Sequence, residues 1–162
     1  MVDLINAAYR QQDGRSWTSE ADIVAGERIN AEQLQQALAQ NNFKLFIAEC
    51  AGQLLACIGL TFDADHVEIG TFCIAPHDQN QGIGKHVLDF AEKYVIALKL
   101  PNLTDFVMWV LSVRHELIAY YERRGYMQTG VVDEYPMDAG VGKPIVDLHL
   151  IDMRKSLSIL EN

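Results

Sequence analysis

A glycine-containing segment between two apolar stretches constrains this chain more than any other feature. The segment "PHDQNQGIGKHV", residues 76–87, follows an apolar run that ends near Ile74 and precedes an amphipathic stretch. It therefore predicts a strand-to-helix junction, with Gly82 and Gly84 where the helix should begin. Because glycine in a helix costs about 1 kcal/mol relative to alanine, we expect these positions to be kept bare for an approaching ligand.

Two phosphate-binding glycine loops do not fit the spacing of this segment. A Walker A loop needs a glycine and a hydroxyl residue where the chain has Gln79 and His86. A dinucleotide fingerprint needs a third glycine at Val87 and a tight turn directly after the strand. A third pattern, Gln/Arg-x-x-Gly-x-Gly/Ala, matches residues 79–84 at every fixed position. There, backbone N–H groups and the helix dipole bind a pyrophosphate; a plain glycine-rich connector is the alternative.

Hydrophobic periodicity predicts a mixed α/β (α+β) chain without repeats or linkers, which we interpret as a single domain over residues 1–162. Helices are expected over residues 4–12, 30–42, 83–98 and 115–124. Strands are expected over residues 43–50, 54–62, 66–75, 105–113, 126–132 and 145–153. Asn30 is the expected N-cap of the second helix, and Gly125 the left-handed C-cap of the last.

Composition excludes several classes of function. A net charge of −9 argues against a nucleic-acid partner, which would require a basic surface. No apolar run has the ~20 residues of a membrane span, and the N-terminus lacks a basic patch followed by an apolar stretch, so we expect a cytoplasmic protein without a membrane partner. Cys50, Cys57 and Cys73 are expected to be free thiols, mostly buried. No Cys or His pair has metal-ligand spacing, so no metal is expected.

A second motif gives the glycine loop a context. The segment "AYYERRGY", residues 119–126, follows a buried strand and has the pattern Tyr-Glu-basic-x-Gly-aromatic. Together, in this order and at this separation, the two motifs resemble the GNAT superfamily of acyl-CoA-dependent N-acetyltransferases over roughly residues 1–155. "WTSEAD" and "RHELIAYYERRGYMQTG" further resemble small bacterial members of unassigned substrate. The resemblance implies a mixed, mostly antiparallel sheet with a splayed central parallel strand pair and helices on both faces.

The resemblance also implies acetyl-CoA as co-substrate, held between strands 67–75 and 105–113. The backbone of three strand residues would pair with the pantetheine arm: Phe72, Cys73 and Ile74. The loop would wrap the pyrophosphate through Gln79, Asn80, Gln81, Gly82, Ile83, Gly84 and Lys85. Lys85 would either contact a phosphate directly or remain a solvated lysine in the first helical turn.

By the same resemblance, Tyr121 stands near the sulfur and protonates the departing thiolate; a purely structural tyrosine is the alternative. Glu68 is the candidate base, against a water chain or an exposed strand glutamate. The strand amide near Cys73 would stabilise the oxyanion. Cys73 is not expected to act as a nucleophile because the family transfers acetyl directly to the amine. Tyr120 is expected to pack elsewhere on its helix.

Two departures from the family pattern stand out. Arg114 occupies a position where many members have an asparagine that contacts the cofactor; arginine could instead reach a phosphate or an acidic group. Members also begin with a strand before the first helix, whereas this sequence opens inside that helix. Either the native start lies upstream or an edge strand is lost. We therefore expect an exposed sheet edge or a mobile first helix, and a complete first strand would refute this.

The sequence thus predicts an N-acetyltransferase that moves an acetyl group from acetyl-CoA to a primary amine in a ternary complex. The alternative is an acyl-CoA-binding regulatory module without turnover. The acceptor is a small amine or a protein amine, and homodimer formation is left open. A mouth suited to a cation is one interpretation of six residues, solvated loops being the other: Trp17, Glu20, Asp22, Asp133, Glu134 and Asp138.

Overall fold

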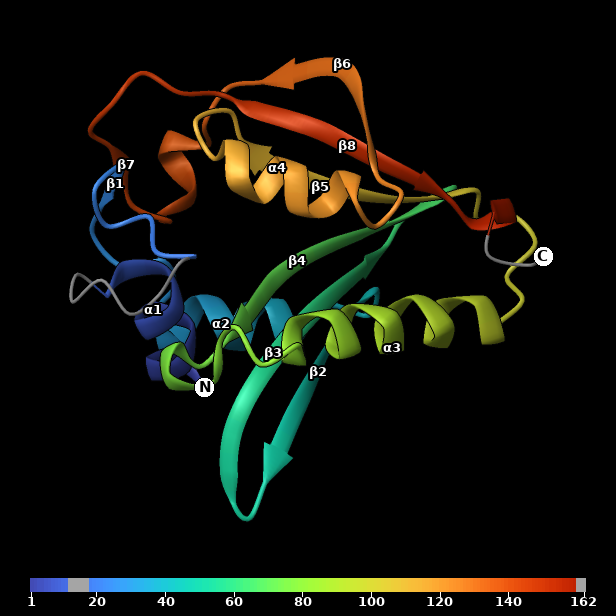
Figure 1. Cartoon of the computed structure of the whole chain (residues 1–162), viewed down its shortest axis with the longest axis horizontal. Helices are drawn as coiled ribbons and strands as arrows, with labels where there is room; N and C mark the ends of the chain where they lie inside the picture. Colours follow the sequence, from blue (N-terminus) through green and yellow to red (C-terminus); the bar gives the residue numbers. More distant parts are fainter. Residues whose placement is uncertain (12–17, 160–162) are drawn as a thin grey trace.

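A six-stranded mixed sheet organises the chain (Figure 1). The computed structural model describes residues 1–11 and 18–159. The sheet has the strand order β2-β3-β4-β5-β8-β6. Its strands are β2 (Phe43–Cys50), β3 (Gln53–Phe62), β4 (His66–Ile74), β5 (Asp105–Leu111), β6 (Met127–Asp133) and β8 (Leu150–Ser156). The helices are α1 (Val2–Arg10), α2 (Ala31–Leu38), α3 (Ile83–Ala97) and α4 (His115–Glu122), with single 3-10 turns at Pro76–Asp78, Met137–Ala139 and Leu157–Ile159.

The central parallel pair, β4 and β5, separates along its length. The two strands pair only over three positions, from His66 with Asp105 to Glu68 with Val107. Beyond these positions β4 bends away from β5, as Figure 1 shows, and the other neighbouring strands in the sheet pair antiparallel. The predicted mixed sheet with a splayed parallel pair is therefore confirmed. The splay leaves one edge of each strand without a ladder partner, and this opening positions the site.

A β-bulge in β4 changes which side chains face each layer. Gly59 pairs with Gly70 but Cys57 pairs with Cys73, so β4 has one extra residue between these pairs. Thr71, inside the bulge, has a left-handed φ of 47°. Val67 and Ile69 pack in the cluster that includes α3, whereas Cys73 packs with α1. The bulge thus reverses the faces of the sheet to which the side chains at the end of β4 point, directly beside the place where β4 and β5 separate.

Helices cover both faces of the sheet, as predicted. Leu88 of α3 and Ile118 of α4 join one buried cluster with Ile58 of β3. Ile5 of α1 packs in a second cluster with Cys57, the neighbour of Ile58 on β3. Because successive strand residues point to opposite faces, the two clusters lie on opposite sides of the sheet. The first is the larger, and it fixes α3 and α4 relative to the open end of β4.

Local signals set the helix ends. Asn30 caps α2 with a capping box, in which its side chain accepts from Gln33 N and the Gln33 side chain accepts from Asn30 N. Gly125 follows α4 with a φ of 87°, the left-handed conformation expected of a C-cap glycine. Both predicted caps are confirmed.

Three features differ from or refine the predictions. β8 covers residues 150–156 rather than 145–153, because Lys155 points inward to a buried Glu92 and so breaks the apolar alternation. A two-stranded ladder, β1 (Val24–Ala25) with β7 (Lys143–Pro144), lies where only loops were predicted. β2 lies at one end of the sheet, and no strand within the described ranges pairs with its outer edge, so the expected open edge is present. In those same ranges no helix is long and apolar enough to cross a bilayer.

Candidate active site

The space between the end of β4 and helices α3 and α4 forms a cleft of about 390 Å³, hereafter the first cleft. It contains most of the predicted cofactor residues together with the predicted acid. Its lining comprises Tyr9, Thr18, Phe72, Cys73, Ile74, Gln79, Asn80, Gly82, Gly84, Lys85, Glu116, Leu117, Tyr120, Tyr121, Arg123 and Arg124. The two sequence motifs, about forty residues apart in the chain, therefore lie on opposite walls of one cavity.

The N-terminus of α3 faces this cleft with open backbone donors. Gly82 is the N-cap, with a left-handed φ of 81°, and no side chain caps the helix. The first helical bond runs from His86 N to Gly82 O at 3.3 Å. The N–H groups of residues 83–85 precede it and so have no acceptor within the helix. Such groups, at the positive end of the helix dipole, suit an anion such as a pyrophosphate.

Gly82 and Gly84 require the absence of a side chain for different reasons. At Gly82 an added Cβ would meet nothing closer than 4.0 Å, so the left-handed backbone is what requires glycine. At Gly84 an added Cβ would lie 3.3 Å from the Tyr120 hydroxyl and 3.8 Å from Phe72 Cζ. A methyl group there would therefore occupy the cleft itself.

Basic side chains line the opposite wall. Arg124 stacks on the Tyr120 ring, 3.4 Å from its centroid, and donates from Nη1 to Tyr120 O at 3.0 Å. Its Nε is the one buried side-chain nitrogen or oxygen without a hydrogen-bond partner among the described residues. Together with Lys85 and Arg123, it makes the cleft basic in an acidic protein. Sequence reasoning missed both arginines as binding residues, although the "ERRG" segment contains them; a polyanionic cofactor such as CoA fits this lining.

The side chains of three predicted loop residues make other contacts within the fold. Gln79 donates from Nε2 to Ile74 O at 3.1 Å and so ties the loop to the end of β4. Gln81 is exposed and reaches back to His77 O. Ile83 lines a separate apolar hollow with Phe46 and Phe90. These side chains shape the loop, and only their backbone remains a candidate for phosphate contact.

The open edge of β4 presents Phe72 and Ile74. Ala75 N donates to Leu55 O on β3, so alternation along the strand directs the backbone of Ile74 and Phe72 to the opposite edge. Tyr9 of α1 donates its hydroxyl proton to Phe72 O at 2.8 Å. Two carbonyls predicted to pair with pantetheine thus already accept bonds from Tyr9 and Gln79, while the amide N–H groups on this edge remain directed toward the opening.

A second cleft of about 330 Å³ lies on the other side of the splay. It shares four residues with the first cleft: Tyr9, Phe72, Leu117 and Tyr121. Apolar residues of β5, from Met108 to Leu111, form much of its wall. Two cavities that meet at a few shared side chains can hold two reactants end to end.

Tyr121 stands where the two clefts meet. It is 7% exposed and packs edge-on against the rings of Tyr120 and Tyr126. Burial raises the pKa of its hydroxyl well above the usual value, so the group stays protonated at neutral pH and can donate. Tyr120 was predicted to pack elsewhere on its helix. Its ring instead lines the first cleft beneath Arg124.

Glu68 lines the second cleft, apart from the glycine loop. It is the last residue of β4 that pairs with β5, and its side chain is half-buried. Burial, and then the nearby Asp63, raise the pKa of its carboxyl. The structure thus places the candidate acid at the junction and the candidate base in the adjoining cavity.

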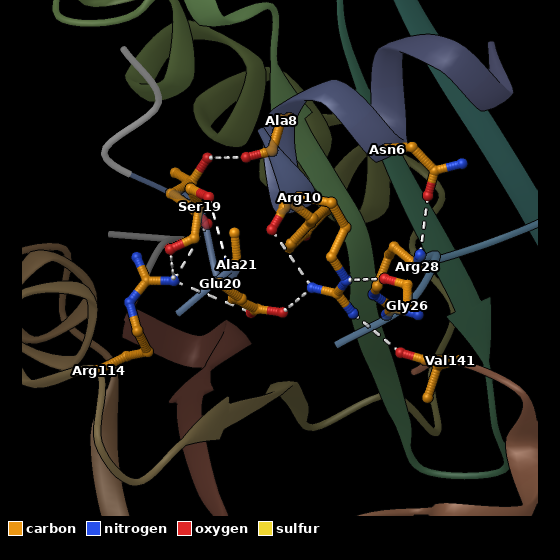
Figure 2. Close-up of polar contacts among 12 residues, drawn as sticks. Asn6, Ala8, Arg10, Ser19, Glu20, Ala21, Gly26, Arg28, Arg114 and Val141 are labelled. Atoms are coloured by element: carbon orange, nitrogen blue, oxygen red, sulfur yellow. Dashed lines mark hydrogen bonds and ion pairs between the residues drawn. The ribbon is translucent and has the colours of Figure 1, made fainter. Parts of the chain in front are cut away.

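Two arginines contact Glu20, which lines the second cleft (Figure 2). Glu20 is buried and accepts a 2.7 Å ion pair from Arg10, while Arg114 approaches it at 3.9 Å. Arg114 also donates to Thr18 O at 3.1 Å and pairs with Glu116. Arg114 therefore reaches acidic groups and backbone, one of the two outcomes its position left open, and anchors the segment that follows α1.

The predicted acidic mouth forms only in part. Glu20 and Asp133 line the second cleft, whereas Asp22, Glu134 and Asp138 are exposed residues outside its lining. Trp17 lies outside the described residues. The set is dispersed because the 3-10 turn at Met137–Ala139 and the β1–β7 ladder carry those side chains to the surface.

The cysteines are free thiols, as predicted. Cys57 and Cys73 are buried with their sulfurs 3.3 Å apart, and Cys50 is exposed. The hydrogen bond with Cys57 and burial both raise the pKa of Cys73. A protonated, buried thiol is a poor nucleophile. Within the described ranges, no group of three or more His, Cys, Asp or Glu side chains is arranged to hold a metal ion.

Comparison with known proteins identifies the architecture. Residues 4–126 match the Acetyltransferase (GNAT) family, well over half of the chain. The chain belongs to this family. The resemblance inferred from the two motifs is thereby confirmed, and this GNAT protein is an acyltransferase. Both motifs, at 79–84 and 119–126, fall within the matched range.

Solved structures share the fold of this GNAT protein. The ribosomal-protein-S18-alanine N-acetyltransferase of Escherichia coli superposes with a TM-score of 0.64 at 16% identity, covering 88% of this chain and 86% of that one. A spermidine N-acetyltransferase chimera of the Vibrio cholerae and human enzymes gives 0.63 at 20% identity, covering 81% and 76%. A GNAT family acetyltransferase from Elizabethkingia anophelis, solved with acetyl-CoA bound, gives 0.59 at 20% identity, covering 78% and 83%.

Proposed function

We propose that this protein transfers the acetyl group of acetyl-CoA to a primary amine by direct attack in a ternary complex. The observation that carries the proposal is the meeting of the two clefts at Tyr121. The basic first cleft, with the open N–H groups of α3, suits the CoA phosphates. The second cleft suits the amine. A solved relative with bound acetyl-CoA supports the choice of donor.

Each step assigns a task to a residue that lines one or both clefts. Glu68, or water beside it, accepts a proton from the ammonium form of the substrate, and the neutral nitrogen then bonds to the acetyl carbon; the second proton that this nitrogen loses on forming the amide restores the hydroxyl of Tyr121. A backbone N–H on the open edge of β4, near Cys73, stabilises the oxygen as it becomes negative. Tyr121 donates to the sulfur as the C–S bond breaks, so the products are an amide and the free thiol of CoA. A thiolate, whose conjugate thiol has a pKa of about 8.5, needs only a well-placed donor.

Thiol release tests the proposal directly. Purified protein is mixed with acetyl-CoA and a panel of primary amines, and free thiol is measured. We expect turnover with at least one amine class and a fall in kcat of about 100-fold or more in Tyr121→Phe. Tyr120→Phe is the matched control, because it removes the neighbouring hydroxyl but keeps the ring beneath Arg124. Its effect on kcat should be much smaller.

The competing function is an acyl-CoA-binding module without turnover. The glycine loop and the basic first cleft serve that function equally well, whereas a donor at the junction of two cavities has no use in it. Tight binding of acetyl-CoA without thiol release on any amine, together with no effect of Tyr121→Phe, would favour the module.

A further inference from the structure

The second cleft contains a guanidinium without an acidic partner. Arg28 lines the cleft, and within the described residues no carboxylate forms an ion pair with it. Its guanidinium carbon lies 5.4 Å from the centroid of the Tyr9 ring. A guanidinium that packs on an aromatic face in a cavity and has no carboxylate partner keeps its charge available to an anionic ligand.

The backbone around Arg28 is fixed from α1. Asn6 Oδ1 accepts from Arg28 N at 2.8 Å and from Ile29 N at 3.2 Å, and Asn6 Nδ2 donates to Ile29 O at 2.8 Å. Figure 2 shows the first of these bonds beside the two arginines that contact Glu20. Three bonds from one side chain hold the backbone that carries Arg28 against α1, so the side chain extends from a fixed point, and its planar guanidinium has the geometry to bind a carboxylate through two hydrogen bonds.

The other charged residues that line the second cleft are three carboxylates, Glu20, Glu68 and Asp133, in different settings. Glu20 is paired with Arg10 and approached by Arg114, so it contributes little net negative potential. Glu68 has a raised pKa and a proposed role with the amine. Asp133 is exposed, and its Oδ1 already accepts from Glu134 N at 2.8 Å. The lining thus offers one arginine and, apart from it, carboxylates, so a ligand with one amine and one carboxylate would find a partner for each group.

We propose that the acetyl acceptor is a small amino acid-like molecule, with a primary amine near Glu68 and a carboxylate bound by Arg28. The apolar wall from Met108 to Leu111 indicates an apolar side chain between the two groups. A volume of about 330 Å³ is at the lower end of small-ligand sites, which suits a molecule of this size. This inference rests on the proposed acetyl transfer and names its substrate class.

Matched acceptors test the carboxylate. The standard amino acids are assayed with acetyl-CoA by thiol release, each beside its carboxamide and its decarboxylated amine. We expect the free amino acid to be preferred over both analogues by about 10- to 100-fold in kcat/KM, the range for a charged hydrogen bond. Equal or better use of the carboxamide, the decarboxylated amine or a polyamine would overturn the inference while leaving acetyl transfer intact.

Variants of Arg28 separate binding from a structural role. Arg28→Gln should raise KM for the amino acid about 10- to 100-fold with kcat little changed, and should leave the decarboxylated amine within about threefold. Arg28→Lys should recover part of the loss. If Arg28 only supports Tyr9, all acceptors will lose kcat together, and the inference fails.

A binding measurement covers the case without turnover. Calorimetric titration of the CoA-bound protein with the same amino acids should show binding that Arg28→Gln weakens. If thiol is never released but this binding is present, the proposed function fails and the carboxylate site stands. If neither turnover nor binding is found for any carboxylate-bearing amine, the inference fails.

Discussion

The guanidinium of Arg124 lies 3.4 Å from the centroid of the Tyr120 ring, stacked across the first cleft from the glycine loop. Both residues belong to the motif at residues 119–126, which spans the end of α4, so one short segment supplies the aromatic surface, a fixed positive charge and, one residue after Tyr120, the candidate acid Tyr121. The stacking holds Arg124 in one orientation with its buried Nε unpartnered. A phosphate in the cleft would satisfy that donor.

Replacing Arg124 should therefore weaken cofactor binding. We expect Arg124→Gln to raise the Kd for CoA by about 10- to 100-fold, because a charged hydrogen bond is lost. Arg124→Lys should recover only part of the affinity, since lysine keeps the charge but not the planar stacking. Titration calorimetry at low and high salt measures both. Lys93→Gln, at an exposed position of α3 outside the lining of the first cleft, is the control; an equal loss there would show that general charge, not Arg124 itself, binds the phosphates.

The two loop glycines should respond differently to alanine. Gly84→Ala should lower CoA affinity about 10-fold or more, because its methyl group enters the cleft beside Tyr120 and Phe72. Its free energy of unfolding should change by no more than about 1 kcal/mol, since alanine is the better helix former. Gly82→Ala should instead destabilise the fold by about 1–2 kcal/mol through its left-handed φ. Urea unfolding and calorimetry on both variants check this; unchanged CoA affinity in Gly84→Ala would contradict it.

Much of the fold was predictable because its signals are local. Asn30 and Gly125 end helices through caps that a sequence shows directly, and alternation or helical spacing marks most elements. The end of β8 was not predictable, because Lys155 reads as a surface residue until Glu92 is found opposite it. The bulge at Thr71 was also not predictable, because a β-branched residue rarely adopts a left-handed φ and so gives no signal for one.

The candidate site, like the fold, has some residues that the sequence predicts and others that it does not. Backbone-binding residues such as Gly82 and Gly84 follow from spacing, because the chemistry depends on the absence of a side chain. Side-chain contacts across the fold do not. The Gln79 side chain bonds to Ile74 O across the turn at Pro76–Asp78, a contact that the sequence does not show. The position of Arg28 in the second cleft was not predicted, because it depends on the hydrogen bond between Asn6 of α1 and the Arg28 backbone.

Glu68 should make stability depend on pH in a definite direction. Burial raises its pKa in the folded protein above the ordinary value of 4.5, so between these two values the folded state binds more protons than the unfolded state. Its contribution to the free energy of unfolding must then fall as pH rises through this window. At low pH Glu68→Gln should have about the same free energy of unfolding as wild type, and at neutral pH it should be more stable than wild type. Urea unfolding across pH measures this, with the exposed Glu27→Gln as control; a wild-type protein that gains stability over Glu68→Gln as pH rises would contradict it.

The same variant addresses catalysis. If Glu68 accepts the amine proton, Glu68→Gln should lower kcat by about 100-fold and remove the acidic limb of the pH–rate profile. Retention of that limb at nearly full rate would assign the proton to a water chain instead.

A buried triad holds α3 to β8 beneath the site. Lys155 Nζ lies 2.7 Å from Glu92 Oε2, and the Tyr126 hydroxyl donates to Glu92 Oε1 at 2.8 Å. Glu92→Ala would leave an ammonium and a hydroxyl buried without their acceptor, so we expect a loss of about 3–5 kcal/mol in the free energy of unfolding. Lys93→Ala, at the adjacent exposed position of α3, should change it by no more than about 0.5 kcal/mol.

The double variant Glu92→Leu/Lys155→Met tests the physical reason for that loss. Removing both charges while filling their volume should restore most of the stability lost in Glu92→Ala, because the cost comes from the unpaired charge rather than from the absence of the pair. Urea midpoints of the three proteins decide this. If the double variant is as unstable as Glu92→Ala, the ion pair itself supplies the stability and joins α3 to β8 more strongly than apolar packing can.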